Sequence, residues 1–142
     1  MGLLQGCSDT SQAYWPTGIR RHEGAGRSGA ERGLWVYRYF DGNLRARGHY
    51  DSEGHRVGRW ETWFRTGQRD ADGKRQWSEV EQAALRTGPW TFWHENGRMR
   101  FQGEYTAGLR EGPWKAWRPN GQPDPAYAGT YRAGVLDAPD TE

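Results

Sequence analysis

The chain has 142 residues and a formal net charge of +2, with 20 basic and 18 acidic residues intermixed, and its length favours a single domain. Its one cysteine excludes an internal disulfide, and no segment is apolar for long enough to cross a bilayer as a helix. Leucine, isoleucine, valine and phenylalanine make up only about 11% of the chain, which by itself is typical of disorder. However, nine tryptophans and seven tyrosines recur at regular intervals. We therefore expect a thin folded protein held together by contacts between repeats.

The first twelve residues are expected to form a flexible N-terminal segment. Residues 3–7 read Leu-Leu-Gln-Gly-Cys, which resembles the processing site of a bacterial lipoprotein with Cys7 as the lipidated residue. The basic and apolar segments of a signal peptide do not precede this site. Two interpretations stay open. The chain is either a cell-envelope lipoprotein whose start lies upstream of Met1, or a cytoplasmic protein with an accidental cysteine.

From residue 13 to residue 140 the sequence repeats a pattern of about 24 residues, of the form G-x-W-x6-G-x5-G-x-Y. A fixed period of this length is the signature of a repeat array. We place its units near residues 13–32, 33–57, 58–87, 88–111 and 112–142. The turn glycines follow one another at steps of 24, 25, 30 and 24 residues: Gly18, Gly42, Gly67, Gly97 and Gly121.

Each unit is predicted to be a β-hairpin. Asp41-Gly42, Asn96-Gly97 and Asn120-Gly121 are dipeptides that favour tight turns in which both central residues have positive φ. An aromatic segment precedes each turn, and a shorter alternating segment follows it. The fold class that we expect is all-β, an elongated antiparallel meander of successive hairpins in a single-layer twisted sheet.

The unit at 58–87 departs from the pattern. Arg75 stands where the other units have a tyrosine, and about six additional residues precede Gly88. This stretch is the most helix-prone in the chain, and Ser78 with Glu81 fits a capping box. We therefore expect a short helical insert near residues 78–85, which is either a specificity element or a neutral expansion of a loop.

Strand alternation divides the aromatic side chains between two faces. The first face is expected to pack neighbouring hairpins through Trp35, Trp60, Trp90, Trp114, Tyr50, Tyr105 and Tyr131. The second face carries Arg38, Phe40, Trp63, Trp93 and Trp117. A single layer cannot bury both faces, so the second set either packs the hairpins or forms a contact surface for another protein, where tryptophan and arginine are typical anchors.

The recurring G-x-W, Asn-Gly and G-x-Y elements resemble MORN-type repeats, in the variant form of bacterial proteins labelled YwqK-type antitoxins. The resemblance covers roughly residues 13–140. It implies an elongated antiparallel sheet, no cofactor, and a role in protein association, sometimes at membranes. The antitoxin label comes from an association with toxin–antitoxin systems.

Patterns that would indicate catalysis or metal binding are absent from the sequence. The four histidines lie at different repeat positions without ligand-like spacing: His22, His49, His55 and His94. Residues 70–73 begin like a calcium loop but lack its later acids, so we interpret them as a turn. His94 and Glu95 lie at a predicted hairpin tip, exposed and without a pocket. We therefore predict no enzyme activity, no cofactor and no metal.

These observations favour a non-catalytic scaffold that binds a protein partner through an aromatic and arginine-rich face. The alternative is an antitoxin-like regulator that neutralises a cognate toxin. Binding of single-stranded nucleic acid to the rings is a third hypothesis, and the net charge of +2 disfavours it. Contact with a membrane is expected only through lipidation of Cys7.

Overall fold

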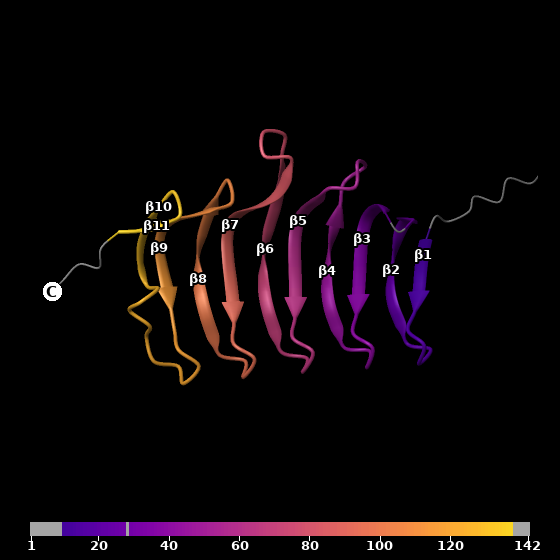
Figure 1. The fold of residues 1–142 in the computed structure, drawn as a ribbon, viewed down its shortest axis with the longest axis horizontal. Helices are drawn as coiled ribbons and strands as arrows, with labels where there is room; N and C mark the ends of the chain where they lie inside the picture. The colour runs from indigo at the N-terminus through magenta and orange to yellow at the C-terminus, as the bar shows by residue number, and fades with distance from the viewer. Residues whose placement is uncertain (1–9, 28, 138–142) are drawn as a thin grey trace, which may run out of the picture.

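The computed structural model describes residues 10–27 and 29–137, and this part of the chain contains strands and turns but no helix. Its strands form one sheet in chain order, each antiparallel to the next, as Figure 1 shows. The predicted all-β meander is therefore confirmed. The strands are β1 (Thr10–Tyr14), β2 (Arg20–Arg27), β3 (Ala30–Arg38), β4 (Leu44–Tyr50), β5 (Arg56–Trp63), β6 (Arg69–Ser78), β7 (Ala83–Trp93), β8 (Met99–Thr106), β9 (Leu109–Ala116), β10 (Gly129–Arg132) and β11 (Val135–Leu136).

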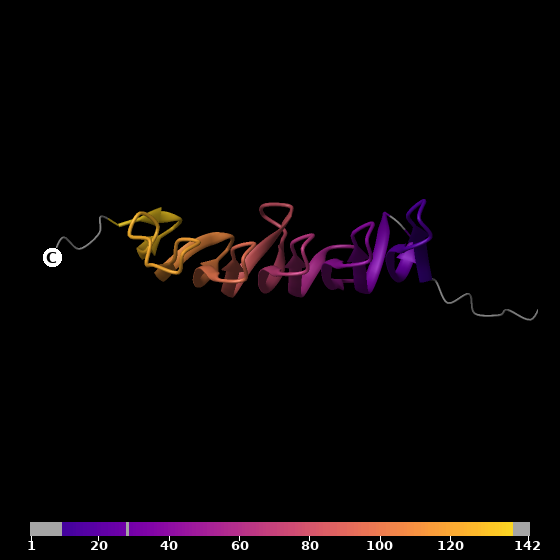
Figure 2. The same ribbon diagram turned by 90° about the horizontal axis from the view of Figure 1, so that it is seen from below.

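The sheet is a single elongated layer. Seen from its edge, the described strands lie side by side with no second layer of secondary structure over either face (Figure 2). Strands β1 and β11 lie at opposite ends of the sheet (Figure 1). Consecutive strands make all the pairings, so the sheet is held by contacts between neighbours, as in other repeat arrays.

The hairpin tips that contain the turn glycines lie along one edge of the sheet (Figure 1). Each of these glycines has a φ between 82° and 94°, but the preceding Asp41, Asn96 and Asn120 do not have positive φ. The prediction of tight turns with two positive φ values was therefore wrong. The loops match the three-residue class, in which only the last residue is left-handed. This geometry explains why Thr17 and Thr66 can precede the glycine equally well.

The predicted helical insert is also wrong. Strand β6 continues to Ser78, a turn covers residues 79–82, and β7 begins at Ala83. The additional residues lengthen both strands, so this loop projects beyond its neighbours (Figure 1). The predicted capping contact exists, since Ser78 Oγ accepts a hydrogen bond of 3.2 Å from the N–H of Glu81, but it stabilises a turn.

Strand pairing explains why the insert extends a hairpin. Trp77 pairs with Ala84 across β6 and β7, and its indole stacks on the imidazole of His55 with 3.6 Å between ring centroids. An isolated helix of two turns is marginal in water, whereas the strands gain ladder hydrogen bonds and this ring contact.

The core lies on the first face, where a tryptophan covers a glycine of the preceding strand in four successive hairpins. A Cβ atom at any of these glycines would lie within 3.0 Å of the indole ring, closer than real Cβ atoms come. The pairs are Trp35 on Gly24, Trp60 on Gly48, Trp90 on Gly73, and Trp114 on Gly103. Each indole Nε1 also donates to the carbonyl of the residue after its glycine: Ala25, His49, Lys74 and Glu104.

The interpretation of residues 70–73 as a turn was also wrong, because these residues belong to a strand that carries one of the covered glycines. They lie within β6, with Ala71 buried and Gly73 beneath Trp90. Their small and acidic composition resembles a loop in the sequence, but glycine and alanine are needed here to admit a large ring from the next strand.

Side chains at the hairpin tips join each unit to the next. The Tyr39 hydroxyl donates to the Trp63 carbonyl at 2.7 Å, and His94 Nε2 lies 2.8 Å from the Trp117 carbonyl. His94 is therefore half-buried and has a structural contact, whereas we had expected an exposed side chain. Phe64 occupies the same repeat position and has no group that could donate.

Candidate functional site

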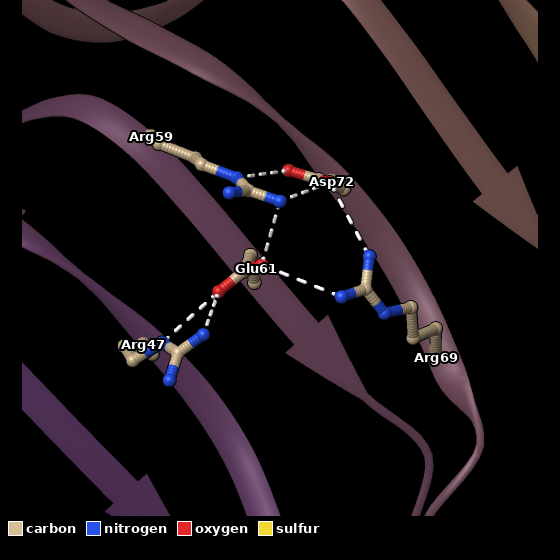
Figure 3. Close-up of polar contacts among 5 residues, drawn as sticks. All are labelled: Arg47, Arg59, Glu61, Arg69 and Asp72. Atoms are coloured by element: carbon tan, nitrogen blue, oxygen red, sulfur yellow. Dashed lines mark hydrogen bonds and ion pairs between the residues drawn. The ribbon is translucent and has the colours of Figure 1, made fainter.

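The second face carries a network of three arginines around two acids, which Figure 3 shows. Arg47, Glu61 and Asp72 are direct cross-strand neighbours on β4, β5 and β6. Arg59 and Arg69 flank this row from β5 and β6. The network is thus assembled by strand register from positions far apart in sequence.

Glu61 is the most buried residue of this network, with 5% of its surface exposed. Its Oε2 accepts hydrogen bonds from Arg47 Nε at 3.0 Å and Nη2 at 2.6 Å. Its Oε1 lies 2.9 Å from Arg59 Nη2 and 3.8 Å from Arg69 Nη2. A nearly buried carboxylate requires such partners, because an unpaired charge away from water is strongly unfavourable.

Asp72 is held by a two-bond contact with Arg59, in which Nε donates to Oδ1 at 2.9 Å and Nη2 donates to Oδ2 at 2.8 Å. These hydrogen bonds lower the pKa of the Asp72 carboxyl, with smaller contributions from the charges of Arg59 and Arg69. The same contact raises the pKa of the Arg59 guanidinium. Asp72 and Arg59 are therefore charged at neutral pH, and the network counts three arginines against two acids, a formal excess of one positive charge.

The predicted binding residues lie on this face, beside the network. Trp63, Trp93 and Trp117 stand at or just beyond the ends of β5, β7 and β9, and all three are half-buried. The guanidinium of Arg47 lies 5.5 Å from the ring of Trp63, and that of Arg69 lies 5.8 Å from the ring of Trp93. These tryptophans make no ring contact with one another in the described part of the chain, and two of them, Trp63 and Trp93, pack against arginines.

Phe40 and Arg38 lie at the tip of the preceding hairpin. Phe40 is 44% exposed, and Arg65 covers its ring at 4.2 Å. Arg38 Nη1 donates to the Gly42 carbonyl at 3.3 Å and so braces its own turn. The five predicted residues therefore form one band near the edge of the tips, with Phe40 as its most exposed ring.

The residues predicted to pack the repeats lie on the first face, in a row of alternating rings. Tyr50 meets the edge of Trp60, Tyr105 meets Trp90 and Trp114, and Tyr131 meets Trp114. Arg75 occupies the tyrosine position between Trp60 and Trp90, and a hollow of about 570 Å³ lies beside it. From Trp35 to Tyr131, this row of tryptophan and tyrosine rings is thus interrupted at Arg75.

The remaining predicted residues are dispersed. Among the residues that the structure describes, no three His, Cys, Asp or Glu side chains are placed to hold a metal ion. His55 contacts the Asp51 carboxylate at 3.1 Å, and backbone N–H groups of residues 55 and 53 help to lower the Asp51 pKa. This cluster closes a turn. Cys7 lies outside the described residues, and the described residues contain no helix able to span a bilayer.

Sequence reasoning missed Glu61 and its arginine partners. The equivalent residues in the other units are Val36, Thr91 and Lys115, none of which is acidic, so periodicity did not single out Glu61. One signal was available. Arg47, Glu61 and Asp72 each stand between two uncharged residues on β4, β5 and β6, as a charged cross-strand row requires.

Residues 86–107 match a family model described as MORN repeat variant. The matched segment spans most of β7 and all of β8, the hairpin with the most regular repeat sequence. This match supports a MORN-repeat protein, and MORN repeats generally serve as interaction repeats for proteins or membranes. No curated protein matches the chain.

Proposed function

We propose that this chain is a non-catalytic repeat scaffold that binds a protein partner through its second face, with Trp63, Trp93 and Trp117 as anchors. One observation carries this proposal. Three half-buried indole rings recur on alternate strands, with arginines over two of them. Alternate strands are about 10 Å apart, so the rings span about 20 Å, a length that suits an interface of ordinary size.

The chemistry of this band suits protein recognition. Tryptophan and arginine are enriched among the residues that dominate binding energy at interfaces. Arg47 and Arg69 are already oriented by Glu61, so a partner would not have to immobilise them, and binding would cost less side-chain entropy. The network carries one more positive than negative charge. We therefore expect a partner surface that combines apolar side chains with carboxylates.

The partner can be identified by mild affinity purification of the full chain from its source cells, followed by mass spectrometry. The mass of the N-terminal peptide would at the same time test lipidation of Cys7. A single small stoichiometric partner that arrests growth when this chain is deleted would specify an antitoxin-like regulator. A partner without toxicity would leave the general scaffold function.

Single replacements of Trp63, Trp93 and Trp117 by alanine test the face with the purified partner. We expect each replacement to weaken binding by at least tenfold, about 1.4 kcal/mol, because buried tryptophans are frequent interface anchors. Circular dichroism monitors the fold of each variant. Tyr127→Ala is the matched control, since Tyr127 is an exposed ring (51%) that contacts Phe101 on the first face. If all three tryptophan variants keep full affinity, the second face is not the interface.

A further inference from the structure

The hollow on the first face is produced by small residues in one cross-strand row. Tyr37, Ala46, Thr62, Ala71 and Phe92 are successive direct partners across β3 to β7. The row continues from Phe92 to Phe101 on β8, which holds a phenyl ring at the repeat position that Ala46 and Ala71 occupy. Three small side chains between two large ones leave a depression about three strands wide.

Arginines converge at one end of this hollow. Elsewhere on this face the repeat arginine meets a tyrosine, since Arg86 Nη1 donates to the Tyr105 hydroxyl at 3.3 Å and Arg110 Nη1 donates to the Tyr131 hydroxyl at 3.2 Å. Arg56 occupies the same repeat position, but the corresponding tyrosine is replaced by Arg75. An arginine–tyrosine pair has thus become an arginine–arginine pair.

This replacement places like charges together. Arg75 is the direct cross-strand partner of Arg86, an arrangement that destabilises a sheet. Burial lowers the pKa of the Arg75 guanidinium, and the charges of Arg86 and Arg56 lower it further. One Arg75 nitrogen donates to the Ala84 carbonyl at 2.9 Å. In the described part of the chain, none of these three arginines forms an ion pair with a carboxylate.

The acid that lines the hollow lies at its other end. Asp70 and Arg75 are five residues apart on β6, which corresponds to about 16–17 Å. Asp70 Oδ2 accepts a hydrogen bond of 2.9 Å from Thr62, and Arg45 lines the same end. The hollow therefore has a cationic end, a middle of small side chains, and aromatic walls. Local conflicts of this kind, here an unneutralised arginine cluster beside an unfilled row, are expected at functional sites.

We propose that this hollow binds a small molecule that carries a carboxylate or phosphate on a flat unsaturated ring. The oxyanion would accept hydrogen bonds from Arg56, Arg75 and Arg86, whose planar guanidinium groups match such groups geometrically. The ring would lie over Ala71, between the aromatic walls. A volume of about 570 Å³ lies in the usual range for small-molecule sites. Trp63 of the proposed protein-binding band also lines the hollow, whereas Arg75 and Ala71 lie outside that band, so changes at Arg75 and Ala71 test this proposal separately from the first.

Titration calorimetry of the full chain at low ionic strength tests this proposal. The probes are phenyl phosphate, benzoate, inorganic phosphate and the uncharged benzyl alcohol. We expect phenyl phosphate, benzoate or both to bind at least tenfold more tightly than inorganic phosphate and benzyl alcohol. Tighter binding of phenyl phosphate would indicate a phosphate ligand, and tighter binding of benzoate would indicate a carboxylate ligand. No binding of either, or equal affinity for inorganic phosphate, would overturn the proposal.

Two variants restore residues that other repeats already carry. Arg75→Tyr rebuilds the row of rings, and Ala71→Phe fills the hollow as Phe101 does in the next unit. Both should reduce affinity for the better ring oxyanion at least tenfold. Because Arg75→Tyr also removes the like-charge pair, its melting temperature should not fall, which separates lost binding from lost folding. Arg132→Tyr, at an exposed position on β10, is the matched control. Unchanged affinity in Arg75→Tyr would refute the site.

Discussion

Replacing Gly73 by alanine tests the contact that holds neighbouring hairpins together. Gly73 has ordinary φ, and its neighbour Trp90 is 3% exposed. The added Cβ would lie within 3.0 Å of three atoms of the indole ring. The ring lies directly over the glycine, so an added Cβ must push it away from the backbone.

The expected decrease in the free energy of unfolding has two contributions. Overpacking a filled core costs about 1–3 kcal/mol. A displaced Trp90 would also lose its 3.0 Å hydrogen bond to the Lys74 carbonyl, which contributes about 1 kcal/mol. We therefore expect Gly73→Ala to lower the free energy of unfolding by about 2–4 kcal/mol, a large share of the 5–15 kcal/mol typical of a domain.

The assay is urea unfolding monitored by tryptophan fluorescence, with hydrogen exchange to locate the weakened strands. Gly18→Ala is the control, because Gly18 has a φ of 82° but no atom within 4 Å of an added Cβ. It should cost only the left-handed strain of about 1–2 kcal/mol, confined to β1 and β2. A Gly73→Ala protein within about 0.5 kcal/mol of the wild type, the usual range of a neutral surface substitution, would refute the role of ring-on-glycine contacts.

Two further predictions concern the hairpin tips and the charged network. Phe64→Tyr should raise the free energy of unfolding by about 1 kcal/mol, because the new hydroxyl can donate to the Trp93 carbonyl as Tyr39 does to the next unit; an unchanged urea midpoint would contradict this. The pKa of Asp72 is lowered in the folded state by hydrogen bonds from Arg59, so its contribution is present above the unfolded pKa of about 3.9 and is lost as the pH falls through the folded value. Stability should therefore fall more steeply below about pH 4 in the wild type than in Asp72→Asn, and parallel urea curves at pH 5 and pH 3 would exclude this linkage.

Much of the fold could be predicted because the residue pattern within each repeat specifies its strands and its turn. A tryptophan two residues after one glycine and a tyrosine two residues after another specify strand alternation, and the regular glycine steps specify the meander. Turn geometry was harder to predict, since an Asp-Gly or Asn-Gly dipeptide suits two loop classes that differ in length by one residue.

The placement of residues on the two faces also followed from alternation, which positioned Trp35 and Trp63 on opposite sides of the sheet. Their roles did not follow. The use of Trp63, Trp93 and Trp117 as a binding band stays a prediction, because alternation specifies a face but not what contacts it.

The sequence by itself determined the repeat and the single-layer sheet, because these depend on residues one strand apart, whereas the ring-on-glycine contacts were found only in the structure. The conformation of the insert and the side-chain contacts that extend over three or more strands were decided only by the tertiary structure. The helix-prone residues 78–85 became strand and turn, because pairing with a neighbour supplies more contacts than an isolated helical turn can. Likewise, Glu61 acquired its arginines, and Arg75 its hollow, from register across three or more strands. Contacts of that kind depend on which residues of separate hairpins are brought into register across the sheet, and no local sequence pattern encodes this register.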